Sequence, residues 1–213
     1  MEAITYMPKC EKLEFRGIHY LLYYPKNYVQ GKKYPVMFHL HGAGSRGTNF
    51  DNFSGSVILN AIEKEDSPLS EGICVFPQCH KDTWFDMFDD LLALAKHIYD
   101  RDDVDKTRFN GSGISMGGYG IYQVMMCLPE LFNKAIVCCG GGMYWNSGRI
   151  KNIKFRIFHG EKDVAVFPEE SKRMYARLKE ACADVSLTVY PDLDHNCWEA
   201  TYGNYENLKW LFE

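Results

Sequence analysis

Strand-sized apolar segments alternate with helix-like segments along most of this chain of 213 residues. Residues 35–40 and 73–76 are short, nearly continuous apolar runs, which is typical of strands that are covered on both faces. In residues 86–101, apolar side chains recur at helical spacing along one side. The alternation predicts an α/β fold in which a mostly parallel central sheet carries helices on both faces.

The other elements follow from the same two patterns. Pro129 ends one helical segment and Pro168 lies near the first turn of another. The expected strands are residues 15–24, 35–40, 73–76, 108–112, 135–139, 155–159 and 186–190, and the expected helices are residues 86–101, 117–128, 168–183 and 202–212. The strand at residues 15–24 is aromatic and partly alternating, so we expect it to lie antiparallel at the edge of the sheet.

The length of the chain favours one domain that covers residues 1–213, since no segment reads as a linker. The net charge is −4 and no basic stripe or basic amphipathic helix occurs, so neither nucleic acid nor a membrane is expected as a partner. The N-terminus has no basic segment followed by an apolar run, so we expect a cytoplasmic protein without a signal peptide, although secretion is not excluded. The sequence leaves the oligomeric state open, a homodimer included.

Eight cysteines are present, an even number that would allow a disulfide framework. The chain is large enough to fold without disulfides, and most of its cysteines lie in or beside apolar segments, so we expect reduced thiols. Cys79-His80 and His195-x-Cys197 are too sparse for a structural zinc site. We therefore expect no metal in the protein.

The segment Gly113-Ile114-Ser115-Met116-Gly117-Gly118 carries the strongest functional signal, because it matches G-x-S-x-G between a predicted strand and a predicted helix. A nucleophile elbow requires this context, since a sharp turn there exposes the serine hydroxyl above the sheet. Glycines on either side let the strand and the helix approach closely. The segment predicts Ser115 as a nucleophile, and a plain glycine-rich turn is the alternative.

A second glycine-rich segment, residues 41–44, directly follows the predicted strand 35–40. Acyl transfer needs two backbone N–H groups that bind the developing oxyanion, one after the nucleophile and one from an earlier loop. The expected donors are Met116 and Ala43, and a loop shaped by packing alone is the alternative. We interpret His41 as a structural hydrogen-bonding residue.

An acid follows the predicted strand 155–159. Asp163 stands beyond the Gly160 turn, where it can orient a catalytic imidazole and stabilise its charged form. Glu161 is the rival carboxylate, but its position directly after Gly160 favours a loop role.

His195 lies in a loop after the last predicted strand, and it completes the chain order Ser, Asp, His. Other histidines, including His159, lie in or beside predicted strands and helices, where packing is the expected role. Asp192 and Asp194 are too close to His195 in sequence to be convenient partners for its ring.

Together these segments resemble the carboxylesterase and feruloyl-esterase-like branch of the α/β-hydrolase superfamily, which includes predicted peptidases and phospholipase/carboxylesterases. The resemblance extends from about Tyr20 to the C-terminus. It rests on Tyr24-Pro25-Lys26-Asn27-Tyr28, Tyr34-Pro35, His39-Leu40-His41-Gly42-Ala43-Gly44, Pro77-Gln78-Cys79, Trp84, Val104-Asp105, Arg108, the elbow segment, His159-Gly160-Glu161-Lys162-Asp163 and His195-Asn196-Cys197-Trp198. It implies an α/β-hydrolase fold and an esterase without metal or cofactor, whose triad is Ser115, Asp163 and His195.

The expected reaction is hydrolysis of a small, aryl or sugar-linked ester through an acyl-enzyme. About fifteen residues separate the predicted strands 135–139 and 155–159, which leaves little room for a lid domain. The aromatic side chains expected to bind substrate are those of Trp84, Tyr119, Trp145 and Trp198, and packing in the core or rim is the alternative for each. A thioesterase, a peptidase and a non-catalytic binding protein on the same scaffold remain open alternatives.

Overall fold

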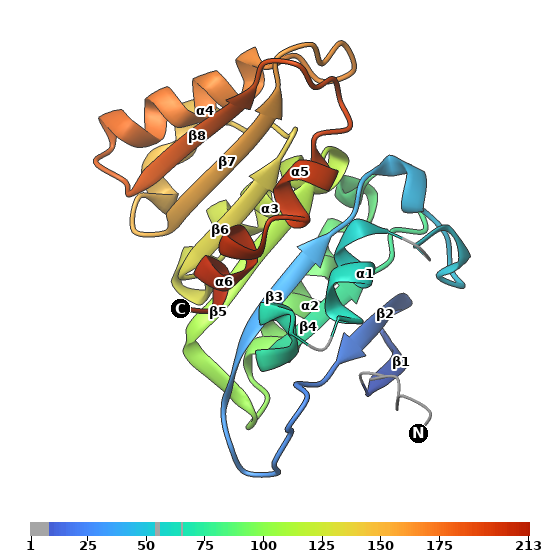
Figure 1. The fold of residues 1–213 in the computed structure, drawn as a ribbon. Helices are drawn as coiled ribbons and strands as arrows, with labels where there is room; N and C mark the ends of the chain where they lie inside the picture. The colour runs from blue at the N-terminus through green and yellow to red at the C-terminus, as the bar shows by residue number, and fades with distance from the viewer. Residues whose placement is uncertain (1–8, 54–55, 65) are drawn as a thin grey trace.

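The computed structural model describes residues 9–53, 56–64 and 66–213. Its centre is an eight-stranded sheet with the order β1-β2-β4-β3-β5-β6-β7-β8 (Figure 1). The strands are β1 Cys10–Phe15, β2 Ile18–Tyr23, β3 Tyr34–Leu40, β4 Ile73–Pro77, β5 Val104–Ile114, β6 Lys134–Cys138, β7 Lys154–Gly160 and β8 Val185–Tyr190. Every neighbouring pair from β4 to β8 in this order is parallel, whereas β1 and β2 pair antiparallel. The predicted mostly parallel sheet is confirmed.

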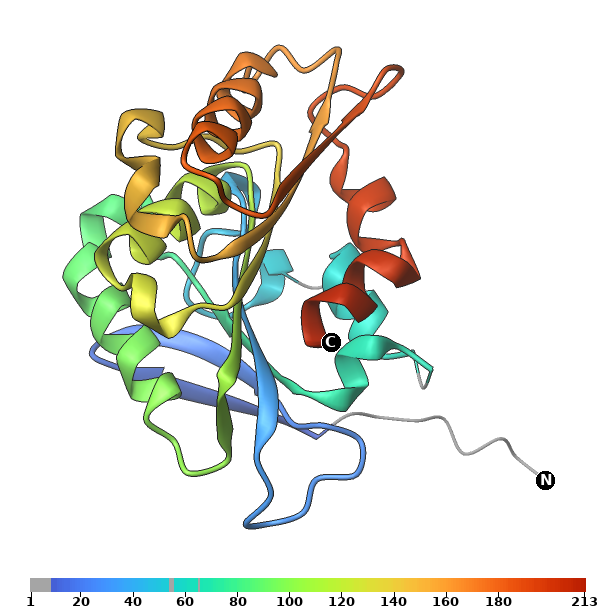
Figure 2. The ribbon, with the colours of Figure 1, turned by 90° about the vertical axis from the view of Figure 1, so that its left-hand side faces the viewer.

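Helices cover both faces of the sheet, as Figure 2 shows. The α-helices are α1 Val57–Ile62, α2 Phe88–Tyr99, α3 Met116–Cys127, α4 Glu169–Glu180, α5 Trp198–Tyr202 and α6 Tyr205–Phe212, and the 3-10 helices are η1 Ala43–Ser45, η2 Asp51–Phe53, η3 Pro68–Glu71, η4 Trp84–Met87, η5 Pro129–Leu131 and η6 Tyr144–Ile150. Leu91, Ile121 and Met174 bring α2, α3 and α4 into one buried apolar cluster. Ile58 and Leu208 belong to the other cluster, which α1, α5 and α6 form with the opposite face.

The sheet begins with a hairpin that the sequence pattern only partly anticipated. Residues 15–24 were expected to form one strand, but Phe15 ends β1 and Ile18 begins β2. Between them, Arg16 and Gly17 have φ angles of 50° and 79°, the left-handed conformation of a two-residue hairpin turn. The side chains of β1 alternate between exposed and half-buried, so this edge strand has no continuous apolar run to reveal it.

The C-terminal segment differs from the single helix expected at residues 202–212. It forms α5 and α6, because the Asn204 side chain accepts a hydrogen bond from the Glu206 backbone N–H at 2.9 Å and starts a new helix. Helix α5 begins at Trp198, earlier than the expected start at residue 202, so the chain is helical shortly after His195.

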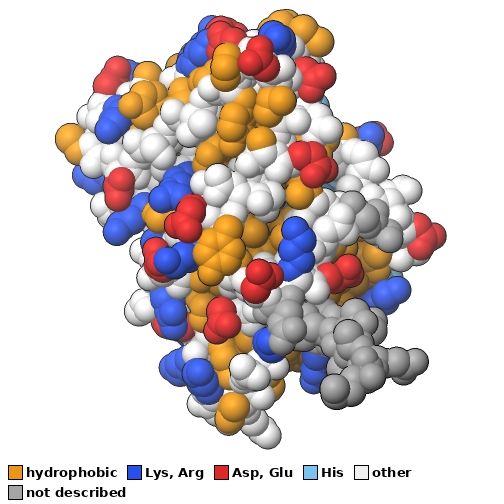
Figure 3. Space-filling model, in the orientation of Figure 1, with side chains coloured by type: hydrophobic (Ala, Val, Ile, Leu, Met, Phe, Trp, Pro, Cys, Tyr) orange, Lys and Arg blue, Asp and Glu red, His pale blue; other side chains and the backbone are white. Residues whose placement is uncertain are grey.

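Two further features bear on access to the sheet. Between β6 and β7 the chain forms η6, a seven-residue 3-10 helix, rather than a domain-sized insertion. On the face shown in Figure 3, acidic and basic side chains are interspersed. Within the described part of the chain, no helix is long and apolar enough to cross a membrane.

The parallel strands bring distant parts of the sequence to one edge of the sheet. Residues 41–45 follow β3, Ser115 follows β5, Asp163 follows β7 and His195 follows β8. Since these strands are parallel neighbours or near neighbours, their carboxyl ends lie at the same edge, where sheets of this kind bind ligands.

Candidate active site

Ser115 lies at the sharp turn between β5 and α3, with φ 52° and ψ −118°. A serine rarely adopts a positive φ, so the turn holds it in a strained conformation. Gly113 and Gly117 permit the turn, since a Cβ on Gly113 would overlap the Gly117 carbonyl and one on Gly117 would overlap the Leu40 carbonyl. The strand–turn–helix context that G-x-S-x-G requires is therefore present.

A hydrogen-bonded series connects the three side chains that the sequence analysis singled out. His195 Nε2 lies 2.9 Å from Ser115 Oγ, and His195 Nδ1 lies 2.6 Å from Asp163 Oδ2. The Asp163 carboxylate is buried, whereas the His195 side chain is 27% exposed. With Nδ1–H donated to the carboxylate, Nε2 is free to accept the proton of the serine hydroxyl.

The acid loop and the histidine loop are held together by backbone contacts. The Lys162 N–H donates to the Leu193 carbonyl at 2.9 Å. Gly160 lies so close to the histidine loop that a Cβ there would overlap the carbonyl oxygen of Asp194. The glycine after β7 thus allows Asp163 to reach the ring of His195.

The Asp163 carboxylate accepts hydrogen bonds at both oxygens. Oδ1 accepts from the backbone N–H groups of Ala165 and Val166, each at 2.9 Å. Burial by itself raises the pKa of this carboxyl, but the hydrogen bonds from His195, Val166 and Ala165 outweigh it and hold the pKa below its ordinary value. The carboxylate therefore stays ionised beside the imidazole.

His159 is a functional candidate that the sequence analysis assigned to packing. Its Nε2 lies 3.1 Å from Asp163 Oδ2 and 2.9 Å from the Val166 carbonyl, and both acceptors require a proton on that nitrogen. Its Nδ1 lies 2.7 Å from Ser171 Oγ. The side chain is completely buried at the end of β7. The spacing of His159 and Asp163, at positions i and i+4 across a glycine turn, was the available signal.

The loop that contains Ala43 lies beside the elbow. Ala43 begins η1 and Met116 begins α3. As first residues of helices, neither has an intrahelical acceptor for its N–H. A Cβ on Gly42 would lie 3.5 Å from Ser115 Cβ, which shows how closely the two segments approach. The two segments that carry the expected donors therefore lie close together.

His41 and Trp84 hold the loop of residues 41–45 in place through hydrogen bonds. The His41 ring accepts a hydrogen bond from the Cys79 N–H at 3.0 Å and lies 2.6 Å from the Gly42 carbonyl through its other nitrogen. The Trp84 indole N–H donates to the His41 carbonyl at 3.1 Å. Burial lowers the pKa of His41 to about 4, so the ring stays neutral and can accept as well as donate.

A cavity of about 480 Å³ opens beside Ser115 and His195. It lies between the loops after β3 and β5 on one side and helices α1 and α5 on the other. Its lining consists of His39, His41, Gly42, Ala43, Gly44, Ser45, Asn52, Phe53, Ser56, Val57, Ile58, Ile114, Ser115, His195, Trp198 and Glu199.

Comparison with known proteins places this geometry in a known fold. No family model and no curated protein matches the chain. Among solved structures, a thermostable esterase is similar over 98% of this chain and 62% of its own, with 31% identity and a TM-score of 0.82. A ferulic acid esterase is similar over 97% of both chains, with 16% identity and a TM-score of 0.69. Dipeptidyl peptidase 4 of Porphyromonas gingivalis is similar over 96% of this chain and 35% of its own, with 13% identity and a TM-score of 0.71.

The chain has the α/β-hydrolase fold. The predicted α/β-hydrolase fold is thereby confirmed, and so is the resemblance to its esterase and feruloyl-esterase-like members. The chain spans 62% of the length of the thermostable esterase, and 35% of that of the peptidase.

Of the aromatic side chains expected to bind substrate, Trp198 lines the cavity, and its ring meets that of His195 edge-on at 5.5 Å between centroids. The expectation for Trp84 is wrong, because its side chain is completely buried beneath the loop of residues 41–45. Tyr119 and Trp145 lie outside the lining. Burial and the nearby Glu170 raise the pKa of Tyr119 to about 12, and Trp145 is 66% exposed.

The rival acids have other partners in this fold. Glu161 forms an ion pair with Lys172 at 3.2 Å, and Asp192 forms one with Lys162 at 3.2 Å. Asp194 accepts a hydrogen bond from the Asn196 N–H at 2.9 Å. These contacts fix the surface of the two loops, while Asp163 is the carboxylate that meets His195.

Groups of His, Cys, Asp or Glu with potential ligand atoms within 4.8 Å of one another occur twice in the described residues. One group contains Cys139, Asp163 and His195, but the latter two already bond to each other. The other contains three thiols, those of Cys138, Cys139 and Cys197.

Proposed function

We propose that this chain is a serine carboxylic-ester hydrolase that works through an acyl-enzyme. The observation that carries the proposal is the series Ser115 Oγ–His195–Asp163, with distances of 2.9 and 2.6 Å. The similarity to proteins named as a thermostable esterase and a ferulic acid esterase supports ester bonds as the substrate.

In the proposed reaction, His195 Nε2 takes the proton of Ser115 Oγ as the oxygen attacks the ester carbonyl. The backbone N–H groups of Ala43 and Met116 bind the oxyanion that forms. The tetrahedral intermediate collapses, and His195 gives its proton to the departing alcohol. Water, activated by the same ring, then releases the acid from the serine.

Asp163 acts in this scheme by stabilising the imidazolium and fixing the tautomer of His195. Its lowered pKa keeps it charged throughout the reaction. His159 is a positioning residue, since it contacts the Asp163 carboxylate, which in turn meets His195.

The proposed substrates are small, aryl or sugar-linked esters. A cavity of about 480 Å³ falls within the usual range for a small-molecule site. Phe53, Val57 and Trp198 give it apolar walls that suit an acyl group of aryl size, and Asn52 and Glu199 add polar atoms at the lining. With only η6 between β6 and β7, we expect no interfacial activation on emulsified triglyceride.

The first test is labelling by a fluorophosphonate, followed by turnover of p-nitrophenyl acetate, butyrate and octanoate and of feruloyl esters. We expect a single adduct that Ser115→Ala abolishes, together with a loss of at least about 10³-fold in kcat. Ser56→Ala is the matched control, because Ser56 lines the same cavity without a contact to His195. Full activity in Ser115→Ala, or a folded wild type that neither reacts with the probe nor turns over any ester, would refute the proposal.

A peptidase is the second candidate, and the similarity to dipeptidyl peptidase 4 is what favours it. Matched ester and amide versions of one acyl group separate the two candidates, since both would use the same three side chains. A thioester of that acyl group extends the test to thioesterase activity. Faster cleavage of the amide than of the ester would replace the esterase proposal with a peptidase.

A further inference from the structure

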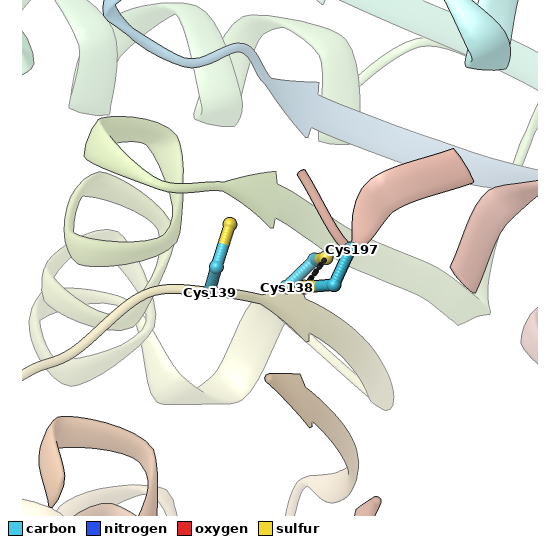
Figure 4. Close-up of side chains that lie close together, drawn as sticks. All are labelled: Cys138, Cys139 and Cys197. Carbon is cyan, nitrogen blue, oxygen red and sulfur yellow. Dashed lines mark hydrogen bonds between the residues drawn. The ribbon is translucent and has the colours of Figure 1, made fainter. Parts of the chain in front are cut away.

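Three buried thiols form a cluster (Figure 4), and one of them, Cys139, lies within 4.8 Å of the side-chain ligand atoms of Asp163 and His195. Cys138 ends β6, Cys139 follows it, and Cys197 belongs to the loop that carries His195. The Sγ atoms of Cys138 and Cys197 are 3.3 Å apart, and the Cys139 Sγ lies within 4.8 Å of both. All eight cysteines of the chain are free thiols in this structure.

We propose that Cys138 and Cys197 are a site of reversible oxidation to a disulfide, and that forming this bond lowers the rate of hydrolysis. The oxidation site does not depend on the proposed esterase function, whereas the effect on the rate of hydrolysis rests on that function.

The geometry favours this pair over any other. A disulfide requires an S–S distance of about 2.05 Å, so the two sulfur atoms must approach by roughly 1.3 Å from the observed contact of 3.3 Å. The five thiols outside the cluster are poor partners: two are buried elsewhere in the fold, Cys74 and Cys79, and three are exposed, Cys10 in β1, Cys127 at the end of α3 and Cys182 just after α4.

Forming the disulfide requires a two-electron oxidant such as hydrogen peroxide. The Cys197 sulfur attacks one peroxide oxygen, the O–O bond breaks, and a sulfenic acid forms as water leaves. The Cys138 sulfur then attacks the sulfenic sulfur, the S–O bond breaks, and a second water carries away the remaining proton. Two thiols and one peroxide thus give one disulfide and two waters.

Two observations support Cys197 as the thiol that reacts first. Hydrogen bonds from the Cys138 and Cys139 thiols lower the pKa of Cys197, which favours the reactive thiolate. Cys197 also lies in an irregular segment between β8 and α5, and local opening of such a segment is how a small oxidant reaches a buried group.

Backbone hydrogen bonds connect the thiol cluster to the candidate active site. Cys138 accepts a hydrogen bond from the Ser115 N–H through its carbonyl at 2.9 Å, and the Cys197 N–H donates to the His195 carbonyl at 2.9 Å. The β6 strand is paired on both sides, so the shift that closes the S–S bond falls on the histidine loop. His195 then moves relative to Ser115 Oγ, and a displacement of about 1 Å can cost on the order of 10²-fold in rate.

The test uses a variant in which the exposed cysteines Cys10, Cys127 and Cys182 are replaced by serine, so that only buried thiols remain. After treatment with a small excess of hydrogen peroxide, we expect non-reducing peptide maps to show a Cys138–Cys197 bridge. We also expect kcat for a p-nitrophenyl ester to fall at least tenfold and to recover with dithiothreitol.

Cys138→Ala in the same background is the test variant, and Cys139→Ala is its matched buried control. We expect Cys138→Ala to form no bridge and to keep its kcat after peroxide, whereas Cys139→Ala responds like the parent. Cys197→Ala replaces Cys138→Ala if that variant does not fold. A folded parent that forms no bridge, a bridge made through Cys139, or a Cys138–Cys197 bridge with unchanged kcat would overturn the proposal. Because the bridge is detected by mass, an inactive protein that still forms it would refute the esterase proposal and leave the oxidation site standing.

Discussion

His159 Nε2 lies 3.1 Å from Asp163 Oδ2, the same oxygen that His195 Nδ1 approaches to 2.6 Å. Two histidines therefore share one carboxylate oxygen, and only one of them reaches the serine. His159 is fully buried and held by Ser171, so its contact with Asp163 is fixed by the packing of β7 against α4.

The first prediction concerns this shared oxygen. We expect His159→Asn to lower kcat about tenfold, because the side chain loses the nitrogen that donates to Asp163. The measurement is steady-state hydrolysis of a p-nitrophenyl ester, with the free energy of unfolding measured alongside it by urea unfolding.

His159→Gln is the matched variant, because its amide nitrogen can occupy the place of Nε2. It should restore kcat. A loss in kcat that His159→Gln fails to restore would mean that His159 only packs and does not position Asp163.

The second prediction concerns the contact between the acid loop and the histidine loop. Gly160→Ala should lower kcat about 10²-fold, because the new Cβ would overlap the carbonyl oxygens of Asp194 and Leu193 and push His195 away. The same overlap should cost about 1–3 kcal/mol in the free energy of unfolding. Urea unfolding and steady-state kinetics measure the two effects.

Gly148→Ala is the matched control, since a Cβ at Gly148 would have no atom within 4 Å. It should leave both quantities near their wild-type values. Wild-type kcat in Gly160→Ala would mean that the two loops adjust without disturbing the serine–histidine contact.

The third prediction separates the roles of the tryptophans. Trp84→Phe should lower kcat about tenfold with little change in KM, because it removes the N–H that holds the His41 carbonyl and loosens the loop of Ala43. Trp198→Ala should instead raise KM for aryl esters, because Trp198 lines the cavity. Trp145→Ala, an exposed control, should change neither constant. A higher KM with unchanged kcat in Trp84→Phe would contradict the role in the loop.

The fourth prediction concerns acid stability. The unfolded chain binds a proton on His41 below about pH 6.5, whereas burial keeps the folded ring neutral down to about pH 4. Since the unfolded state binds more protons in this window, the stability of the fold falls as the pH drops from about 6.5 to 4. A difference of this size corresponds to as much as about 3 kcal/mol from His41.

His41→Gln tests this assignment, because the amide oxygen can still accept from the Cys79 N–H but does not titrate. We expect the free energy of unfolding of the variant to decline less than that of the wild type between pH 6.5 and 4. Parallel declines, measured by urea unfolding at several pH values, would assign the acid sensitivity to other groups such as the buried His39.

Much of the sheet could be predicted because strands covered on both faces need continuous apolar side chains. Residues 35–40 and 73–76 have such runs, and each lies within a strand of the structure. The edge strand β1 alternates between exposed and half-buried side chains, so it carries no comparable signal. Helix α1 is only six residues long, too short for its apolar spacing to stand out.

The sequence by itself indicated the elbow, because G-x-S-x-G between a strand and a helix is the local pattern that a nucleophile elbow requires. It also indicated Asp163 and His195, since the order of residues along the chain decides which strand end each one follows. What those residues touch was decided by the tertiary structure alone. The second histidine on Asp163, the burial of Trp84 and the contact between Cys138 and Cys197 all depend on distances between strands that are far apart in the sequence. Local patterns report which face of an element is apolar, and they carry no information about which side chain of another element that face will meet.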